Sequence, residues 1–165
     1  MLSVAKYLKS RGGRFSNHLS RLRHFRGHGV HSPYVYSIVR NVLMSRRLHG
    51  DAAPLFEALN RYGCDRRSSI EISNLVSHCG YYNFDIDRLS ESNDVAICTH
   101  QMDDHTLQEL IRRASKQGAT VVILASNKRV QLCETIVKYH RSTTIDRLNY
   151  LVILNNHLPK QHFKL

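Results

Sequence analysis

The strongest constraint on the fold is a strand–helix–strand pattern in the second half of the chain. Residues 120–125 form an almost continuous apolar run, and residues 94–99 form a similar one. Runs of this kind are typical of strands that a parallel sheet buries on both faces. The stretch between them is amphipathic, with Asp103 at its start and Gly118 at its end, and these features predict a helix. Two such strands joined by a helix predict a parallel pair in an α/β protein.

Further elements extend this pattern on both sides. Helical spacing of apolar residues predicts helices over 33–47, 54–62 and 130–140. The short stretch 68–72 is strand-like, apolar runs predict strands over 143–148 and 150–154, and we expect a short strand over 161–165. We therefore expect a mostly parallel sheet, in which the first three strands are mutually parallel, with an antiparallel C-terminal hairpin.

The N-terminal part of the chain carries most of the positive charge. Residues 1–50 contain ten Lys or Arg and no Asp or Glu, and the net charge of the whole chain is +11. We divide the chain into a basic, helical N-terminal arm, residues 1–50, and an α/β domain, residues 51–165, within one globular unit. The arm predicts binding to nucleic acid or to a protein partner, although a solvated basic surface explains the same composition. The cations that would contact phosphates are Lys6, Lys9, Arg11, Arg14, Arg21, Arg23 and Arg26.

No sequence feature predicts a membrane segment or a metal site. Apolar runs are much shorter than the roughly 20 residues that a transmembrane helix needs, so we expect a cytoplasmic protein. The four cysteines lack the paired C-x-x-C spacing of a zinc site, which predicts reduced thiols. His24, His28 and His31 have a spacing that favours ligation on one helix face, but Gly27 and Gly29 break that helix. We therefore predict no bound metal.

The segment after the arm's cluster of cations carries a motif. Its residues are His28, Gly29, Val30, His31, Ser32 and Pro33. They resemble the opening motif of a group of class I S-adenosylmethionine-dependent methyltransferase-like proteins, and residues 144–146 and 160–164 are similar to the last strands of that group. The resemblance implies a reduced, Rossmann-like methyltransferase sheet, which in the family binds S-adenosylmethionine where the first strand meets the first helix.

The chain departs from this family where the cofactor binds. In the family an acidic residue and a glycine-rich turn end the first strand, because glycine lets the backbone approach the cofactor. Here Ser73 and Ser77 occupy the expected glycine positions. Only 21 residues separate Ile72 from Asp94, too few for the two βα units that normally carry the ribose-binding carboxylate. If the cofactor binds, the resemblance assigns it to Glu71, Ser73, Asn74 and Asp85, with Asp87 as a second candidate carboxylate.

These departures favour binding over catalysis. We expect a methyltransferase-like protein that is catalytically inactive, does not bind S-adenosylmethionine and acts in binding or assembly, and we assign no catalytic residue. Two alternatives stay open: an active S-adenosylmethionine-dependent methyltransferase, and a basic RNA-binding or ribosome-associated protein that uses the arm. His100 with Asp103 or Asp104 is a candidate acid–base pair, against a structural role at the start of a helix.

Overall fold

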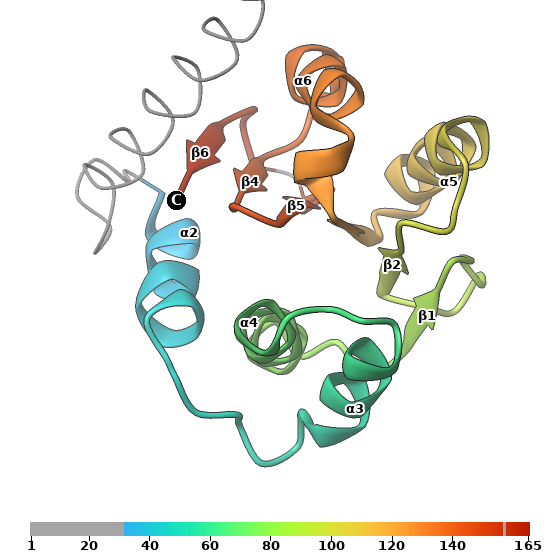
Figure 1. Ribbon diagram of the computed structural model, residues 1–165. Coiled ribbons are helices and arrows are strands. Elements are labelled where there is room, and N and C mark those ends of the chain that lie inside the picture. Colours follow the sequence, from blue (N-terminus) through green and yellow to red (C-terminus); the bar gives the residue numbers. More distant parts are fainter. Residues whose placement is uncertain (1–31, 157) are drawn as a thin grey trace, which may run out of the picture.

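Six strands form one mixed sheet in the order β1-β2-β3-β5-β4-β6 (Figure 1). The structure is a computed structural model and describes residues 32–156 and 158–165. Strands β1, β2 and β3 are parallel, β5 is antiparallel to both of its neighbours, and β6 is parallel to β4. The strand bounds are β1 (Phe84–Ile86), β2 (Val95–Cys98), β3 (Thr120–Leu124), β4 (Thr144–Asp146), β5 (Tyr150–Ile153) and β6 (His162–Lys164).

Helices cover both faces of the sheet and enclose two apolar cores (Figure 1). One core lies between the sheet and the N-terminal helices α2 (Pro33–Ile38), η2 (Val39–Leu43, a π-helix), α3 (Ala53–Arg61) and α4 (Arg66–His78). The other lies under α5 (Asp104–Gln117) and α6 (Val130–Tyr139), and a short 3-10 turn, η3 (Ser126–Lys128), precedes α6. Alternate residues of each buried strand supply the two cores, so both faces of the sheet are apolar.

The strand–helix–strand prediction is confirmed for β2, α5 and β3, because local signals fix both ends of the helix. The Asp103 carboxylate accepts hydrogen bonds from the free backbone N–H groups of His105 and Thr106, each at 3.0 Å. Gly118 ends the helix in the left-handed conformation, at φ 75°, which a residue without a Cβ adopts freely. The predicted C-terminal hairpin is also present, as β4 and β5.

Two predicted elements differ in the structure. The predicted strand over 68–72 is wrong, because these residues lie inside α4, which begins where the Asp65 side chain accepts a hydrogen bond from the Ser68 N–H at 3.0 Å. The first strand is instead β1, sixteen residues further along the chain. The predicted helix over 33–47 ends at Leu43, after a turn of π-helix. Helices α3 and α6 match their predicted ranges closely.

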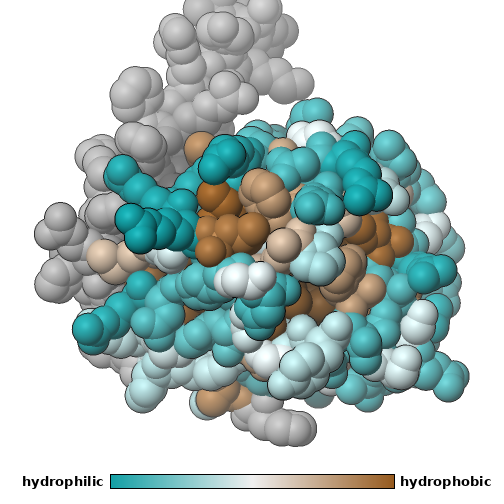
Figure 2. All heavy atoms as spheres, turned by 90° about the horizontal axis from the view of Figure 1, so that it is seen from below, coloured by the Kyte–Doolittle hydropathy of each residue, from teal (hydrophilic) through white to brown (hydrophobic). Residues whose placement is uncertain are grey.

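On the face that Figure 2 shows, polar and charged side chains surround apolar areas. None of the helices in the described ranges is long and apolar enough to cross a membrane.

Candidate functional site

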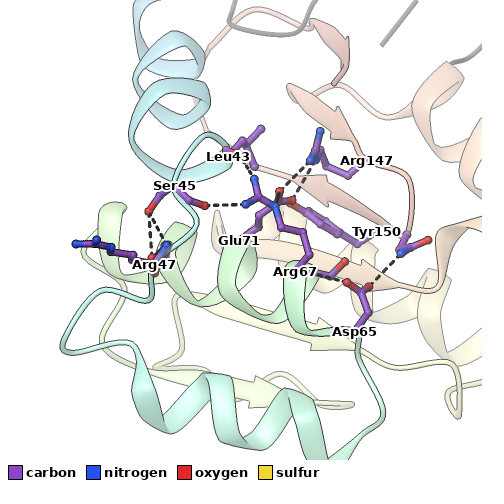
Figure 3. Close-up of polar contacts among 11 residues, drawn as sticks. Leu43, Ser45, Arg47, Asp65, Arg67, Glu71, Arg147 and Tyr150 are labelled. Carbon is purple, nitrogen blue, oxygen red and sulfur yellow. Dashed lines mark hydrogen bonds and ion pairs between the residues drawn. The ribbon is translucent and has the colours of Figure 1, made fainter. Parts of the chain in front are cut away.

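Helix α4 carries a carboxylate, Glu71, into the core beneath the sheet (Figure 3). Its side chain is 1% exposed, and three donors surround it. Arg67, one helical turn earlier, donates from Nε at 2.6 Å, and Arg147, in the turn between β4 and β5, donates from Nη2 at 2.9 Å. The Tyr150 hydroxyl donates at 2.7 Å. We call these four residues the Glu71 cluster.

The Glu71 cluster shifts the pKa values of two of its members, Arg147 and Tyr150. Burial alone would lower the pKa of the Arg147 guanidinium, but the negative charge of Glu71 raises it above its usual value. Burial, together with the same carboxylate, raises the pKa of Tyr150 well above its usual value. The phenol therefore stays protonated, and its O–H donates the hydrogen bond to Glu71. Bonds from charged donors of this kind compensate for taking the carboxylate out of water. The hydrogen bonds and ion pairs of the cluster join α4 to the β4–β5 hairpin of the sheet.

Polar side chains of α4 also fix the connection between η2 and α3. The Arg67 guanidinium donates to the Ser45 carbonyl at 3.0 Å and to the Leu43 carbonyl at the end of η2. About two turns further along α4, Asn74 accepts from the His49 N–H and donates to a backbone carbonyl of the same connection, both at 2.9 Å. Asn74 is fully buried, and its amide is occupied on both sides.

The two serines at the expected glycine positions lie inside α4, not in a turn. Ser73 is buried, and its hydroxyl has no hydrogen-bond partner among the described residues. Ser77 donates to the Asp51 carboxylate at 2.8 Å. A glycine-rich turn after a strand needs backbone that is free to approach a ligand, whereas the N–H groups of a helix interior are used within the helix. The placement of the cofactor motif in this stretch is therefore wrong for this structure.

Asp85, the fourth residue assigned to the cofactor, lies on the opposite face of the sheet from α4. Its neighbours in β1, Phe84 and Ile86, pack into the core that contains α4, so Asp85 points to the other side. The carboxylate accepts from the Ser90 N–H at 2.7 Å and from the Arg88 Nε at 2.8 Å. Burial alone would raise the pKa of Asp85, but these hydrogen bonds and the Arg88 charge hold it below its usual value. The four assigned residues do not converge on one site.

The side chain of Asp87, the second candidate carboxylate, joins the carboxyl ends of β1 and β2. Asp87 follows β1 in the left-handed conformation, at φ 54°. Its two carboxylate oxygens accept from the N–H and the hydroxyl of Thr99, each at 2.6 Å. Ligands of open α/β sheets bind in the crevice beyond the carboxyl ends of the strands. Here the Asp87–Thr99 contact occupies that position between β1 and β2.

The candidate acid–base pair does not form. Both carboxylate oxygens of Asp103 bind residues of the first turn of α5, including the Thr106 hydroxyl at 2.6 Å, and these bonds lower the pKa of Asp103. Asp104 lies 3.6 Å from the Arg129 guanidinium. No hydrogen bond or ion pair within residues 32–156 and 158–165 joins His100 to either aspartate, and its backbone carbonyl accepts from Arg129 at 3.2 Å.

Residues 1–31 of the predicted arm, with most of the opening motif, lie outside the described residues. This applies to the seven arm cations from Lys6 to Arg26 and to His28, Gly29 and His31. The last two motif residues are described: the Ser32 hydroxyl accepts from the Val35 N–H at 3.4 Å, and Pro33 is the first residue of α2. Ser32 is therefore the N-cap of this helix, as its sequence predicts. In the described part of the chain, no three His, Cys, Asp or Glu side chains are grouped as metal ligands would be.

Sequence reasoning missed the partners that surround Glu71. Only the i, i+4 spacing of Arg67 and Glu71 could have indicated a pair, and then only on a helix. Arg147 and Tyr150 are more than 70 positions away in the chain and carry no such signal.

No family model matches the sequence, and comparisons with curated proteins and with solved structures give no match. The resemblance to methyltransferase-like proteins therefore stays a prediction from the motif residues.

Proposed function

We propose that the chain is a catalytically inactive, methyltransferase-like protein that acts in binding or assembly. The observation that carries this proposal is the Asp87–Thr99 contact, which occupies the end of β1 and β2 where an open α/β sheet would receive a ligand. Opening that position would break two short hydrogen bonds to a carboxylate, which are stronger than bonds between neutral groups.

The strand connections add support. Adjacent parallel strands usually need a crossover of a dozen or more residues, commonly with a helix. Residues 87–94 alone connect β1 to β2, and they contain no helix. The position where the resemblance expects two further βα units, with their ribose-binding carboxylate, is reduced to this short connection. After β2 the chain continues through α5, β3 and α6 to the C-terminal strands. Of the six strands of the sheet, β5 alone runs in the opposite direction.

Calorimetric titration of the full chain with S-adenosylmethionine tests the proposal. We expect no saturable heat, so that any binding is weaker than about 1 mM. The reason is that Glu71, Asn74 and Asp85 already have protein partners, and the end of β1 is occupied by Asp87. S-adenosylhomocysteine is the control ligand, because it lacks the reactive methyl group but shares the groups that such a site would recognise. Micromolar binding of either ligand, lost on Asp85→Asn substitution, would favour the active methyltransferase instead.

A second candidate function, binding of nucleic acid through the arm, is favoured by one sequence observation. Residues 1–31 contain seven cations and no acid, whereas residues 32–165 contain 17 and 13. We expect the quadruple variant Arg14→Ala, Arg21→Ala, Arg23→Ala and Arg26→Ala to bind single-stranded RNA with a shallower salt dependence. The log–log slope should fall by about 0.7 for each phosphate contact removed. Fluorescence anisotropy of a labelled oligouridylate at several salt concentrations measures the slope. A slope equal to that of the parent would mean that the arm does not contact phosphates.

A further inference from the structure

The C-terminal segment of the chain carries an excess of positive charge at one end of the sheet. Residues 32–137 contain twelve Lys or Arg and twelve Asp or Glu, so they carry no net charge. Residues 138–165 contain five Lys or Arg and one acid. This segment forms the end of α6 and the last strands β4, β5 and β6, and β6 is the edge of the sheet (Figure 1). The sequence drew attention to the arm, but it did not indicate that a second basic surface forms here.

Strand β6 places its charged side chains on one face. Phe163 packs into the core that contains α4, and Leu165 is buried in the same core. Because side chains alternate along a strand, His162 and Lys164 point to the opposite face, the face that α6 covers. Lys160, which precedes β6, lies on the same side, since it contacts the end of α6. Contacts between β6 and its neighbours agree with this direction: His162 Nδ1 lies 2.9 Å from the Thr144 hydroxyl on β4.

Two lysines, each two positions from His162, lower the pKa of its imidazole. Burial lowers the pKa of His162 to about 4, and the positive charges of Lys164 and Lys160 contribute to this shift. The imidazole is therefore neutral at pH 7, and the two ammonium groups create one positive field around it. Lys160 also reaches the end of α6, where its Nζ donates to the Lys138 carbonyl at 2.5 Å.

Most of these cations are available to a ligand. Lys138, Arg141 and Lys160 are exposed. Arg147, the other cation of this segment, binds Glu71 in the opposite core and does not belong to this surface. Asp146, the one acid of the segment, is the register partner of Lys164 across β4 and β6 and moderates its charge. We call Lys138, Arg141, Lys160 and Lys164 the α6–β6 basic surface.

We infer that the α6–β6 basic surface binds the phosphate backbone of a single-stranded nucleic acid. Lys164 lies on β6, and Lys160 reaches the Lys138 carbonyl at the end of α6, so these cations lie together at this edge of the sheet and complement the repeated negative charges of a phosphodiester chain. Three of the four cations are lysines, which act on phosphate as point charges without selecting a base. The inference does not depend on the cofactor site or on the arm, so it goes beyond the proposed function and holds whether or not S-adenosylmethionine binds.

The test compares two triple variants of the full chain. The surface variant combines Lys138→Gln, Arg141→Gln and Lys160→Gln, and it leaves Lys164 beside Asp146 in place. The control variant, Arg112→Gln, Lys116→Gln and Lys128→Gln, removes the same charge from exposed residues of α5 and η3. Circular dichroism and thermal unfolding establish that both variants fold, which we expect because exposed substitutions seldom change stability by more than about 0.5 kcal/mol.

Anisotropy titrations with labelled oligouridylate at several salt concentrations give the result. We expect the surface variant to lower the log–log salt slope by about 2, for three phosphate contacts at about 0.7 each, and the control variant to leave it unchanged. Equal slopes for the surface variant and the parent, or an equal decrease in both variants, would overturn the inference. Poly-glutamate serves as a second probe: loss of poly-glutamate binding with unchanged RNA binding would also overturn it, in favour of an acidic protein partner.

Discussion

Replacing Glu71 with alanine is expected to destabilise the fold by about 3–5 kcal/mol, the largest effect of any single substitution that we predict. The carboxylate is 1% exposed and accepts from Arg67, Arg147 and Tyr150 (Figure 3). Without it the Arg147 side chain, which is 20% exposed, keeps its charge but loses its partner. An uncompensated charge and an unpaired phenol in the core are each unfavourable. Urea unfolding, followed by circular dichroism, measures the change.

Two further variants distinguish the cluster from a general effect of removing a glutamate. Glu57→Ala on α3 breaks an exposed i, i+4 pair with Arg61, at 3.9 Å, and should change the free energy of unfolding by less than about 0.5 kcal/mol. Glu71→Gln keeps the shape and an acceptor for Tyr150, so it should retain more stability than alanine. The total stability of such a domain is about 5–15 kcal/mol, so Glu71→Ala can leave the chain unfolded. The Glu71→Gln variant then still allows the free energy of unfolding to be measured. A loss below about 1 kcal/mol for Glu71→Ala would show that the cluster is not a stabilising unit.

The parts of the fold that the sequence predicts well are those that local signals determine. Asp103 and Gly118 set the ends of α5, and the flanking apolar runs are short and rich in β-branched residues, which favours buried strands. The predicted strand over 68–72 fails for a different reason. Every residue from Ser68 to Val76 is buried, polar ones included, so α4 lacks the division into an apolar and a solvated face that marks a surface helix. A short stretch of this kind does not distinguish a buried helix from a buried strand. Asp65, which caps α4, was the signal that would have identified the helix.

The candidate site was less predictable than the fold because its contacts join distant parts of the chain. Glu71 was singled out as a carboxylate at the end of a strand, but its actual environment depends on Arg147 and Tyr150, which the β4–β5 hairpin brings to α4. Asp85 was assigned to the same site, yet the alternation of side chains along β1 directs it to the other face. The sequence therefore showed which polar residues to consider, whereas the order of the strands was needed to know which of them lie together.

The Asp87–Thr99 contact at the end of β1 connects the stability of the fold with the proposed loss of the cofactor site. We expect Asp87→Ala to destabilise the fold by about 3 kcal/mol. The carboxylate accepts two hydrogen bonds of 2.6 Å from Thr99, and a hydrogen bond to a charged group contributes about 1.5–3 kcal/mol. Thr99 is 1% exposed, so its N–H and hydroxyl lose a partner inside the protein. Alanine is also less suited than aspartate to the left-handed backbone at φ 54°.

Asp87→Asn is the matched comparison, because asparagine adopts the left-handed conformation and keeps one acceptor for the Thr99 N–H. Its loss should be smaller, about 1–2 kcal/mol, since one hydrogen bond persists without the charge. Glu91→Ala, an exposed acid in the same connection, should stay within about 0.5 kcal/mol of the parent. Chemical denaturation ranks the three variants. If Asp87→Ala is no less stable than Glu91→Ala, the Asp87–Thr99 contact does not hold the ends of β1 and β2 together. The alanine variant lacks the carboxylate that occupies this position, so titration of that variant with S-adenosylmethionine shows whether the contact is what excludes the cofactor.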